Sequence, residues 1–151
     1  MAPSDTTPLV GSPKIPTGTS SRPVSTGTIT TLGVVRAVTA AALMFAPQLT
    51  TRLFLLDLPA AASTVTRMIG AREAALSVLL LVGSRRVAVE PATYRDGLRM
   101  AIMAGICADL LDIVAGVVDV ASGSIGMGTF DMVAGGALLA VGLGVVGLRG
   151  L

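Results

Sequence analysis

Residues 66–86 read TRMIGAREAALSVLLLVGSRR, and this stretch decides how the rest of the chain can be arranged. The part from Met68 to Val82 is apolar enough to cross a bilayer, yet it contains two adjacent charged residues, Arg72 and Glu73. Charged side chains inside apolar membrane helices are rare, and they pair with one another or face a wet cavity. The sequence therefore predicts that other helices bring charges to meet this segment.

A second apolar stretch, residues 98–121, carries five small or acidic residues at helical spacing: Gly105, Asp109, Asp112, Gly116 and Asp119. The spacings of four, three, four and three residues place all five on one face of a helix. A helix that faces lipid has no reason to collect three aspartates on one side. We expect this face to line the interior of a helix bundle or a wet cavity.

The composition indicates that the solvent of this chain is a bilayer. Of the 151 residues, 52% are hydrophobic and only 13% are charged, and the mean hydropathy is +0.82. Soluble domains carry roughly 25% charged residues, so this chain has too little polar surface for a water-soluble globule. A net charge of +2 without a basic, aromatic-rich patch argues against nucleic-acid binding.

The residue inventory excludes several kinds of site. There is no histidine, and Cys107 is the only cysteine, so histidine-ligated haem, the usual zinc sites, a Ser-His-Asp triad and an internal disulfide are all excluded. Glu73, Asp109 and Asp112 could in principle bind a hard cation, but Arg72 beside them would repel it. The sequence therefore predicts neither a metal site nor a cofactor.

Four apolar segments of spanning length predict an all-α fold, a membrane-spanning four-helix bundle. The expected spans within the transmembrane domain, residues 29–150, are 29–47, 67–84, 98–120 and 129–149. Residues 1–28 are rich in Ser, Thr, Pro and Gly and are expected to form a disordered polar tail.

Two prolines suggest where helices end and begin. Pro47 is expected to end the first helix, and the connector at residues 48–66 is expected to lie at the membrane interface. Pro91 suits the first turn of a helix, so the third long helix is expected to begin there, before the membrane.

Basic residues predict the topology. With four spans, one side of the membrane holds Lys14, Arg22, Arg85, Arg86, Arg95, Arg99 and Arg149, and the other side holds Arg52 and Arg67. Basic residues favour the cytosolic side. Seven against two predicts an integral, multi-pass membrane protein with both termini in the cytosol.

Depth along the expected helices predicts which charges meet. A rise of about 1.5 Å per residue brings Arg36 close to Asp109, and Arg72 close to Asp112 or Asp119. Glu73 is left over, either protonated or shared with Arg36. Two interpretations stay open: the charges form ion pairs that fix the register of the helices, or they line a polar cavity for a small molecule or a proton.

The chain also resembles a known protein family in several short motifs. The matching elements are Gly33-x-x-Arg36, Pro47, Arg67-x-x-Gly70-x-Arg72-Glu73, Arg99 and Asp109-x-x-Asp112. Over residues 29–149 the chain resembles the DoxX-like superfamily of small four-helix membrane proteins, and within it an uncharacterised family of bacteria and fungi. The resemblance implies a four-helix membrane bundle. It also implies a link to quinone or thiol redox work, which some members of the wider group have.

Three classes of function are compatible with the charged residues. The first is an accessory membrane protein that binds a small lipophilic or polar molecule through Arg36, Arg72, Glu73, Asp109 and Asp112. The second is a membrane enzyme acting on a lipophilic metabolite, with Glu73 or Asp112 as general base and Arg72 stabilising an oxyanion. The third is a proton-coupled transporter that forms a homodimer through the glycine-rich segment 129–149. The sequence leaves open whether the protein is an enzyme.

Overall fold

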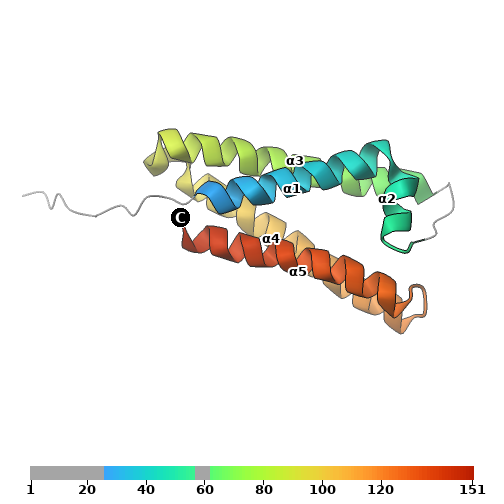
Figure 1. Ribbon diagram of the computed structural model, residues 1–151. Helices are drawn as coiled ribbons and strands as arrows, with labels where there is room; N and C mark the ends of the chain where they lie inside the picture. The colour runs from blue at the N-terminus through green and yellow to red at the C-terminus, as the bar shows by residue number, and fades with distance from the viewer. Residues whose placement is uncertain (1–25, 57–61) are drawn as a thin grey trace, which may run out of the picture.

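The structure, a computed structural model, describes residues 26–56 and 62–151, and within these ranges the only regular secondary structure is helical (Figure 1). The helices are α1 (Thr26–Phe45), α2 (Pro47–Leu53), α3 (Ser63–Val89), α4 (Pro91–Ala121) and α5 (Met127–Arg149). The fold is therefore all-α over the described residues, as the sequence predicts. The expected disordered tail lies outside the described residues, apart from positions 26–28, which belong to α1.

The four long helices lie side by side and alternate in direction. The start of α1, the α3–α4 connection and the end of α5 lie at one end of the molecule, and α2 and the α4–α5 turn lie at the other (Figure 1). Helix α1 packs along α3, α3 against α4, α4 against α5, and α5 against α1. Every long helix thus has two long neighbours, and the side chains between them form one shared interior.

Prolines set two of the helix boundaries. The first helix ends at Phe45, as Pro47 predicts, but Pro47 itself begins a short helix, α2, that the sequence does not predict. Proline suits this position because its missing N–H has no helical partner in the first turn. Pro91 begins α4 directly after Glu90, which confirms the prediction that this helix starts early.

The segment that follows α2 is hydrogen-bonded to the first turn of α5. In this segment, Leu55 adopts a left-handed backbone conformation with φ of 56°, which is uncommon for a residue other than glycine. The hydroxyl of Thr129, in the first turn of α5, donates a hydrogen bond of 3.2 Å to the carbonyl of Leu55. Leu55, just after α2, is therefore held against the first turn of α5.

Glycines let α1 and α3 approach closely. A Cβ added to Gly33 would lie 2.9 Å from Leu81, and one added to Gly70 would lie 3.2 Å from the backbone oxygen of Ala40. Small residues at such positions allow the backbones of membrane helices to come together. Ser77 adds a hydrogen bond of 2.9 Å from its hydroxyl to the carbonyl of Gly33. The α1–α3 pair is thus the closely packed half of the fold.

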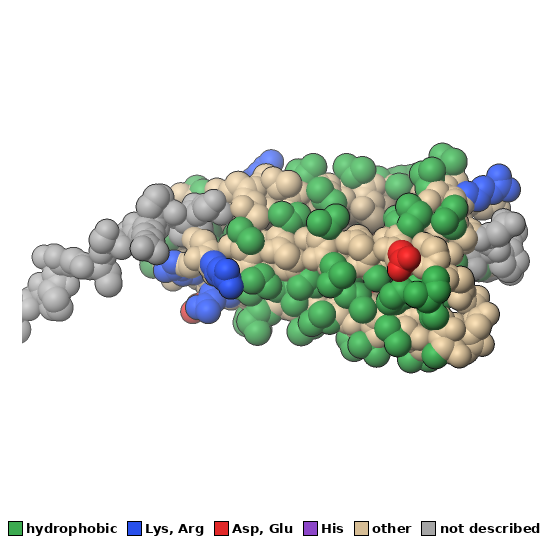
Figure 2. Space-filling model, turned by 60° about the horizontal axis from the view of Figure 1, so that its bottom comes forward, with side chains coloured by type: hydrophobic (Ala, Val, Ile, Leu, Met, Phe, Trp, Pro, Cys, Tyr) green, Lys and Arg blue, Asp and Glu red, His purple; other side chains and the backbone are tan. Residues whose placement is uncertain are grey.

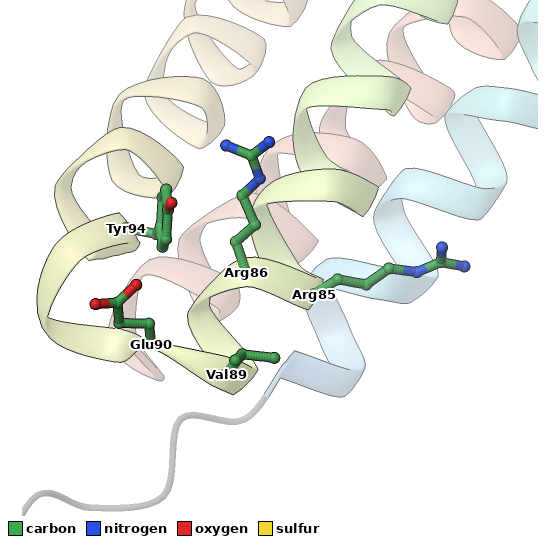
Figure 3. A pocket seen from close by; sticks show the side chains of 5 residues that line it. All are labelled: Arg85, Arg86, Val89, Glu90 and Tyr94. Atoms are coloured by element: carbon green, nitrogen blue, oxygen red, sulfur yellow. The ribbon is translucent and has the colours of Figure 1, made fainter.

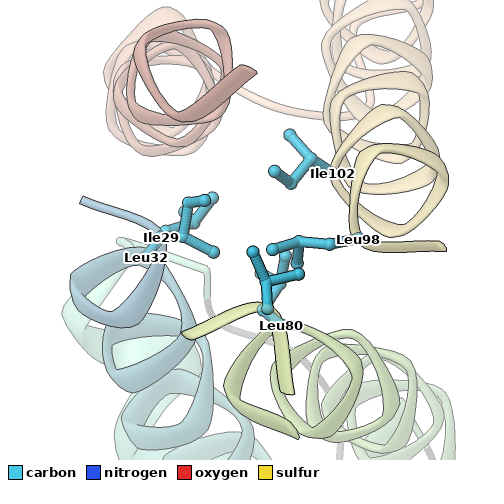
Figure 4. Close-up of a cluster of buried hydrophobic side chains, with 6 residues drawn as sticks. Ile29, Leu32, Leu80, Leu98 and Ile102 are labelled. Atoms are coloured by element: carbon cyan, nitrogen blue, oxygen red, sulfur yellow. The ribbon is translucent and has the colours of Figure 1, made fainter. Parts of the chain in front are cut away.

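An apolar core closes the end where α1 begins. Its buried members come from α1, α3 and α4 and are Ile29, Leu32, Leu80, Val87, Leu98 and Ile102 (Figure 4). Their side chains converge on one another (Figure 4), and α5 covers the cluster from the side through partly buried residues such as Leu143. This core holds the helix ends together, whereas the middle of the interior is charged.

The outer surface is strongly apolar. All four long helices expose large apolar side chains, for example Val38 (65%), Leu79 (54%), Leu111 (68%) and Leu139 (72%). In Figure 2 such side chains cover much of the visible flank, and most of the charged ones lie toward the ends. Soluble monomers rarely expose so much contiguous apolar surface. Of the described helices, α1, α4 and α5 are long and apolar enough to cross a membrane, which supports an integral membrane protein.

Candidate functional site

A charged network joins three helices in the middle of the molecule. Its members are Arg36 of α1, Arg72 and Glu73 of α3, and Asp109 and Asp112 of α4. These are the five ligand-binding candidates selected from the sequence. The structure therefore brings all of them together.

One arginine holds the centre of this network. Nη1 of Arg36 donates a hydrogen bond of 2.5 Å to Oε2 of Glu73, and its Nη2 donates to Oδ2 of Asp109. The guanidinium presents several donors in one plane, so it can bind two carboxylates on two different helices at once. Arg36 thus connects α1 to α3 and α4, and the predicted pairing of Arg36 with Asp109 is confirmed.

A second arginine joins α3 to α4. Arg72 binds Asp112 in a bidentate manner, with 3.0 Å from Nη1 to Oδ1 and 2.6 Å from Nη2 to Oδ2. The same Nη2 lies 3.0 Å from Oε1 of Glu73. Arg72 and Glu73 leave α3 in different directions, yet the arginine side chain is long enough to reach back. Glu73 is therefore shared by both arginines and is not left over.

Exposure changes sharply along the network. Only 5% of the Arg36 side chain, 9% of Glu73 and 7% of Asp109 are exposed, whereas 37% of Arg72 and 39% of Asp112 are exposed. The network therefore has a closed end at Arg36 and an open end, formed by Arg72 and Asp112, at the surface between α3 and α4.

The network has hydrogen-bonding capacity to spare. The Nε atoms of Arg36 and Arg72 are buried and have no hydrogen-bond partner among the residues that the structure describes. Leaving a buried donor unpaired costs about 1–3 kcal/mol. The network also contains two arginines and three carboxylates, so it carries a net negative charge when every member is ionised. A further hydrogen-bond acceptor, a proton or a positive group would complete it.

Gly105 makes room for the central arginine. A Cβ added at Gly105 would lie 3.4 Å from Nη2 of Arg36. Gly105, Asp109 and Gly116 are buried, as the predicted face of α4 requires. Asp119, however, is exposed near the end of α4 and forms no salt bridge within the described residues. The alternative pairing of Arg72 with Asp119 is therefore wrong.

Other chemistry-bearing residues lie outside this network. Cys107 is exposed on α4. Within residues 26–56 and 62–151, no group of three or more histidine, cysteine, aspartate or glutamate side chains is arranged to hold a metal ion. A Cβ added at Gly135, Gly136 or Gly142 would meet no described atom within 4 Å. Homodimerisation through this part of α5 stays a prediction.

The corner between α3 and α4 forms a second polar region, which was not predicted from the sequence. A pocket of about 350 Å³ is lined there by Arg85, Arg86, Val89, Glu90 and Tyr94 (Figure 3). From the sequence, these two arginines predicted only the topology. Arg86 and Arg85 precede Tyr94 by eight and nine residues, and Pro91 begins a new helix between them, which is the pattern that could have indicated this pocket.

No protein-family model, curated protein or solved structure matches this chain. The resemblance to the DoxX-like superfamily therefore stays a prediction.

Proposed function

We propose that this chain is a four-span integral membrane protein that binds a small polar or amphipathic molecule at the Arg72–Asp112 end of its charged network. The observation that carries the proposal is the change in exposure along one connected network, from 5% at Arg36 to 39% at Asp112. A closed, paired interior holds the open end in place. The role we favour is accessory, binding without catalysis.

The proposal requires α3 to be the fourth span. Helix α3 has 27 residues, about 40 Å at about 1.5 Å per residue, which exceeds the ~30 Å of hydrocarbon in a bilayer. Its internal charges, Arg72 and Glu73, are paired with α1 and α4. Pairing lowers the free-energy cost of placing charges in a membrane helix. Its other charges, Arg67, Arg85 and Arg86, lie near its two ends.

The depth of the network favours a functional site. Arg36 lies ten residues after Thr26 and nine before Phe45, at the middle of α1. If α1 crosses the membrane, the network lies near the midplane of the bilayer. Ionisable residues at that depth mark substrate, ion or ligand pathways by default.

The open end suits a molecule that enters from the lipid. Arg72 and Asp112 lie between α3 and α4, and nearby residues on α4 such as Leu111 and Val114 expose 68% and 60% of their surface. In hydrocarbon the exposed part of this ion pair would lack water. A molecule with a carbonyl or hydroxyl head could hydrogen-bond to that exposed part, and its apolar body could lie against the neighbouring apolar side chains.

Binding fits the geometry better than catalysis does. A general base needs a free oxygen that can take a proton from the substrate. Both oxygens of Asp112 accept hydrogen bonds from Arg72, and the two oxygens of Glu73 accept from Arg36 and Arg72. A substrate proton would have to compete with an arginine for either carboxylate, which disfavours the enzyme alternative.

The resemblance to the DoxX-like superfamily supports the same proposal. The arginines and carboxylates that carry the resemblance, including Arg36, Arg72 and Asp109, are the residues that form the network. A quinone, whose two carbonyls and apolar tail match the open end, is one ligand class that the resemblance implies. We also propose cytosolic termini, because the start of α1 and the end of α5 share the end of the molecule that contains Arg85, Arg86 and Arg149 (Figure 1).

The proposal can be tested by identifying small molecules that co-purify with the protein. The native chain and the Arg72→Gln/Asp112→Asn variant would be purified from membranes, and their organic extracts compared by mass spectrometry. Asp119→Asn is the matched control, because it neutralises an exposed acid on the same helix. We expect a molecule in the native and control extracts that is depleted at least tenfold in the double variant, roughly 1.4 kcal/mol of binding free energy. Equal content in a double variant of native helicity would contradict the proposal.

A further inference from the structure

The corner between α3 and α4 forms a pocket at the end of the molecule where α1 begins. It consists of the last turn of α3, the single residue Glu90, and the first turn of α4 (Figure 3). Its volume is about 350 Å³, and its lining contains two arginines, one glutamate, one valine and one tyrosine. This lining combines positive charge with an aromatic ring and an apolar surface, and it lies far from the Arg36 network.

An arginine and a tyrosine face each other across this pocket. The guanidinium carbon of Arg86 lies 5.2 Å from the centroid of the Tyr94 ring, within the range of a cation–π interaction. The Arg86 side chain lies beside the Tyr94 ring, whereas Arg85 extends in another direction (Figure 3). Among the described residues, Arg86 forms no salt bridge. Its guanidinium is thus oriented by the ring and keeps its donors free for an anion.

The local charge favours an anion despite the presence of Glu90. Four exposed basic residues, Arg85, Arg86, Arg95 and Arg99, lie on this corner, against two exposed acidic residues, Glu90 and Asp96. Glu90 lies on the other side of the Tyr94 ring from the guanidinium of Arg86 (Figure 3). From there its carboxylate can accept hydrogen bonds from hydroxyl groups of the same ligand.

An apolar surface continues from Arg86 toward the middle of α3. Val78, Leu79 and Val82 precede Arg86 by eight, seven and four residues, which places them on the same side of the helix. They expose 58%, 54% and 44% of their surface. A ligand with a phosphate at Arg86 and a hydrocarbon chain along these residues would contact both the charged and the apolar part of this surface.

We infer that this corner is a binding site for the phosphate headgroup of an anionic phospholipid whose acyl chain lies along α3. Basic pockets between membrane helices on the cytosolic side bind such headgroups. Glu90 favours a headgroup with hydroxyl donors, such as phosphatidylglycerol. The inference rests on the membrane embedding proposed above, and it is independent of the ligand at Arg72.

The test is a lipid titration of the full chain, purified in detergent and followed by native mass spectrometry. The probes are phosphatidylglycerol, phosphatidylcholine of the same acyl chains, and inorganic phosphate. We expect the native chain to prefer phosphatidylglycerol, and Arg86→Gln to weaken its binding roughly fivefold, since one arginine near a membrane surface contributes about that factor. Tyr94→Leu should also weaken it without any change in charge.

Arg67→Gln is the matched control, because it removes an exposed arginine at the other end of the same helix. It should leave the preference for phosphatidylglycerol unchanged. The inference would be overturned if Arg67→Gln and Arg86→Gln had equal effects, if Tyr94→Leu had none, or if inorganic phosphate displaced the lipid. Carbonate extraction of membranes distinguishes failure of this lipid site from failure of the membrane proposal. A chain that resists extraction but shows no lipid preference refutes the lipid site alone. A chain that is extracted refutes the membrane proposal.

Discussion

Arg36 of α1 and Glu73 of α3 form an ion pair with 2.5 Å between Nη1 and Oε2, and only 5% and 9% of their side chains are exposed. The same guanidinium binds Asp109 of α4. One side chain therefore fixes the relative positions of three helices. We expect the register of the fold to depend on this contact, because a charge buried without its partner is strongly destabilising.

Replacing Arg36 with methionine should therefore be costly. The Arg36→Met variant leaves Glu73 and Asp109 as two buried carboxylates without their shared partner. We expect the free energy of unfolding to fall by about 3–5 kcal/mol. Unfolding by sodium dodecyl sulfate in mixed micelles would measure the change.

Two further variants separate lost pairing from lost packing. Replacing both carboxylates as well, in Arg36→Met/Glu73→Gln/Asp109→Asn, should recover part of the loss, because no buried charge remains at the closed end. Asp119→Asn should change stability by less than about 0.5 kcal/mol, as expected for an exposed side chain. If the single Arg36→Met variant is as stable as the native chain, the network is not what holds the helices in register.

The glycines of α3 and α5 should respond differently to a methyl group. A Cβ at Gly70 would lie 2.9 Å from Met44, 3.0 Å from Leu43 and 3.2 Å from the backbone oxygen of Ala40. Gly70→Ala should therefore lower the free energy of unfolding by about 1–3 kcal/mol. Gly142 has no described atom within 4 Å of such a Cβ. Gly142→Ala should then be neutral or stabilising by up to about 1 kcal/mol, because alanine favours helices.

The same unfolding assay checks this pair. The contrast between the two variants matters more than either value, since both replace a helical glycine with alanine. Equal losses at both positions would indicate that α5 packs against something at Gly142, such as a second copy of the chain. Equal gains would contradict the close α1–α3 contact.

Much of the network could be predicted from sequence because helical geometry is regular. A fixed rise per residue gives the depth of each charge, and this was sufficient to pair Arg36 with Asp109 and to limit the partner of Arg72 to Asp112 or Asp119. Arg72 and Glu73 are adjacent and leave α3 in different directions, but this describes where their side chains start and not how far a guanidinium reaches. Glu73 was therefore not expected to bind both arginines.

Features that depend on tertiary contacts could not be predicted in the same way. Asp119 fits the spacing of the acidic face of α4, but it lies near the helix end, where no described partner reaches it. Pro47 correctly predicted the end of α1. Whether the chain then turns or begins a new helix depends on contacts such as that of Thr129 with Leu55. The stacking of Arg86 on Tyr94 likewise depends on how α3 and α4 meet.

The topology can be tested with reporter fusions. Fusions after Gly123, in the α4–α5 turn, and at Leu151 should report opposite sides of the membrane, because α5 lies between them. The Leu151 fusion should report the cytosol, as the arginines at that end predict. Reports from the same side would show that α5 does not cross.

The four-span proposal is tested most directly by determining whether α3 crosses the bilayer with Arg72 and Glu73 inside it. Leu79 is 54% exposed and lies ten residues before Val89, which is 86% exposed. Ten residues span about 15 Å, half of the ~30 Å hydrocarbon thickness. Single cysteines would be introduced by Leu79→Cys or Val89→Cys in a Cys107→Ala background, and labelled with a charged maleimide in membranes open to both sides. We expect Val89→Cys to be labelled in the membrane and Leu79→Cys to be labelled only after denaturation in sodium dodecyl sulfate. Labelling of Leu79→Cys in the membrane as fast as Val89→Cys would show that α3 does not cross the bilayer.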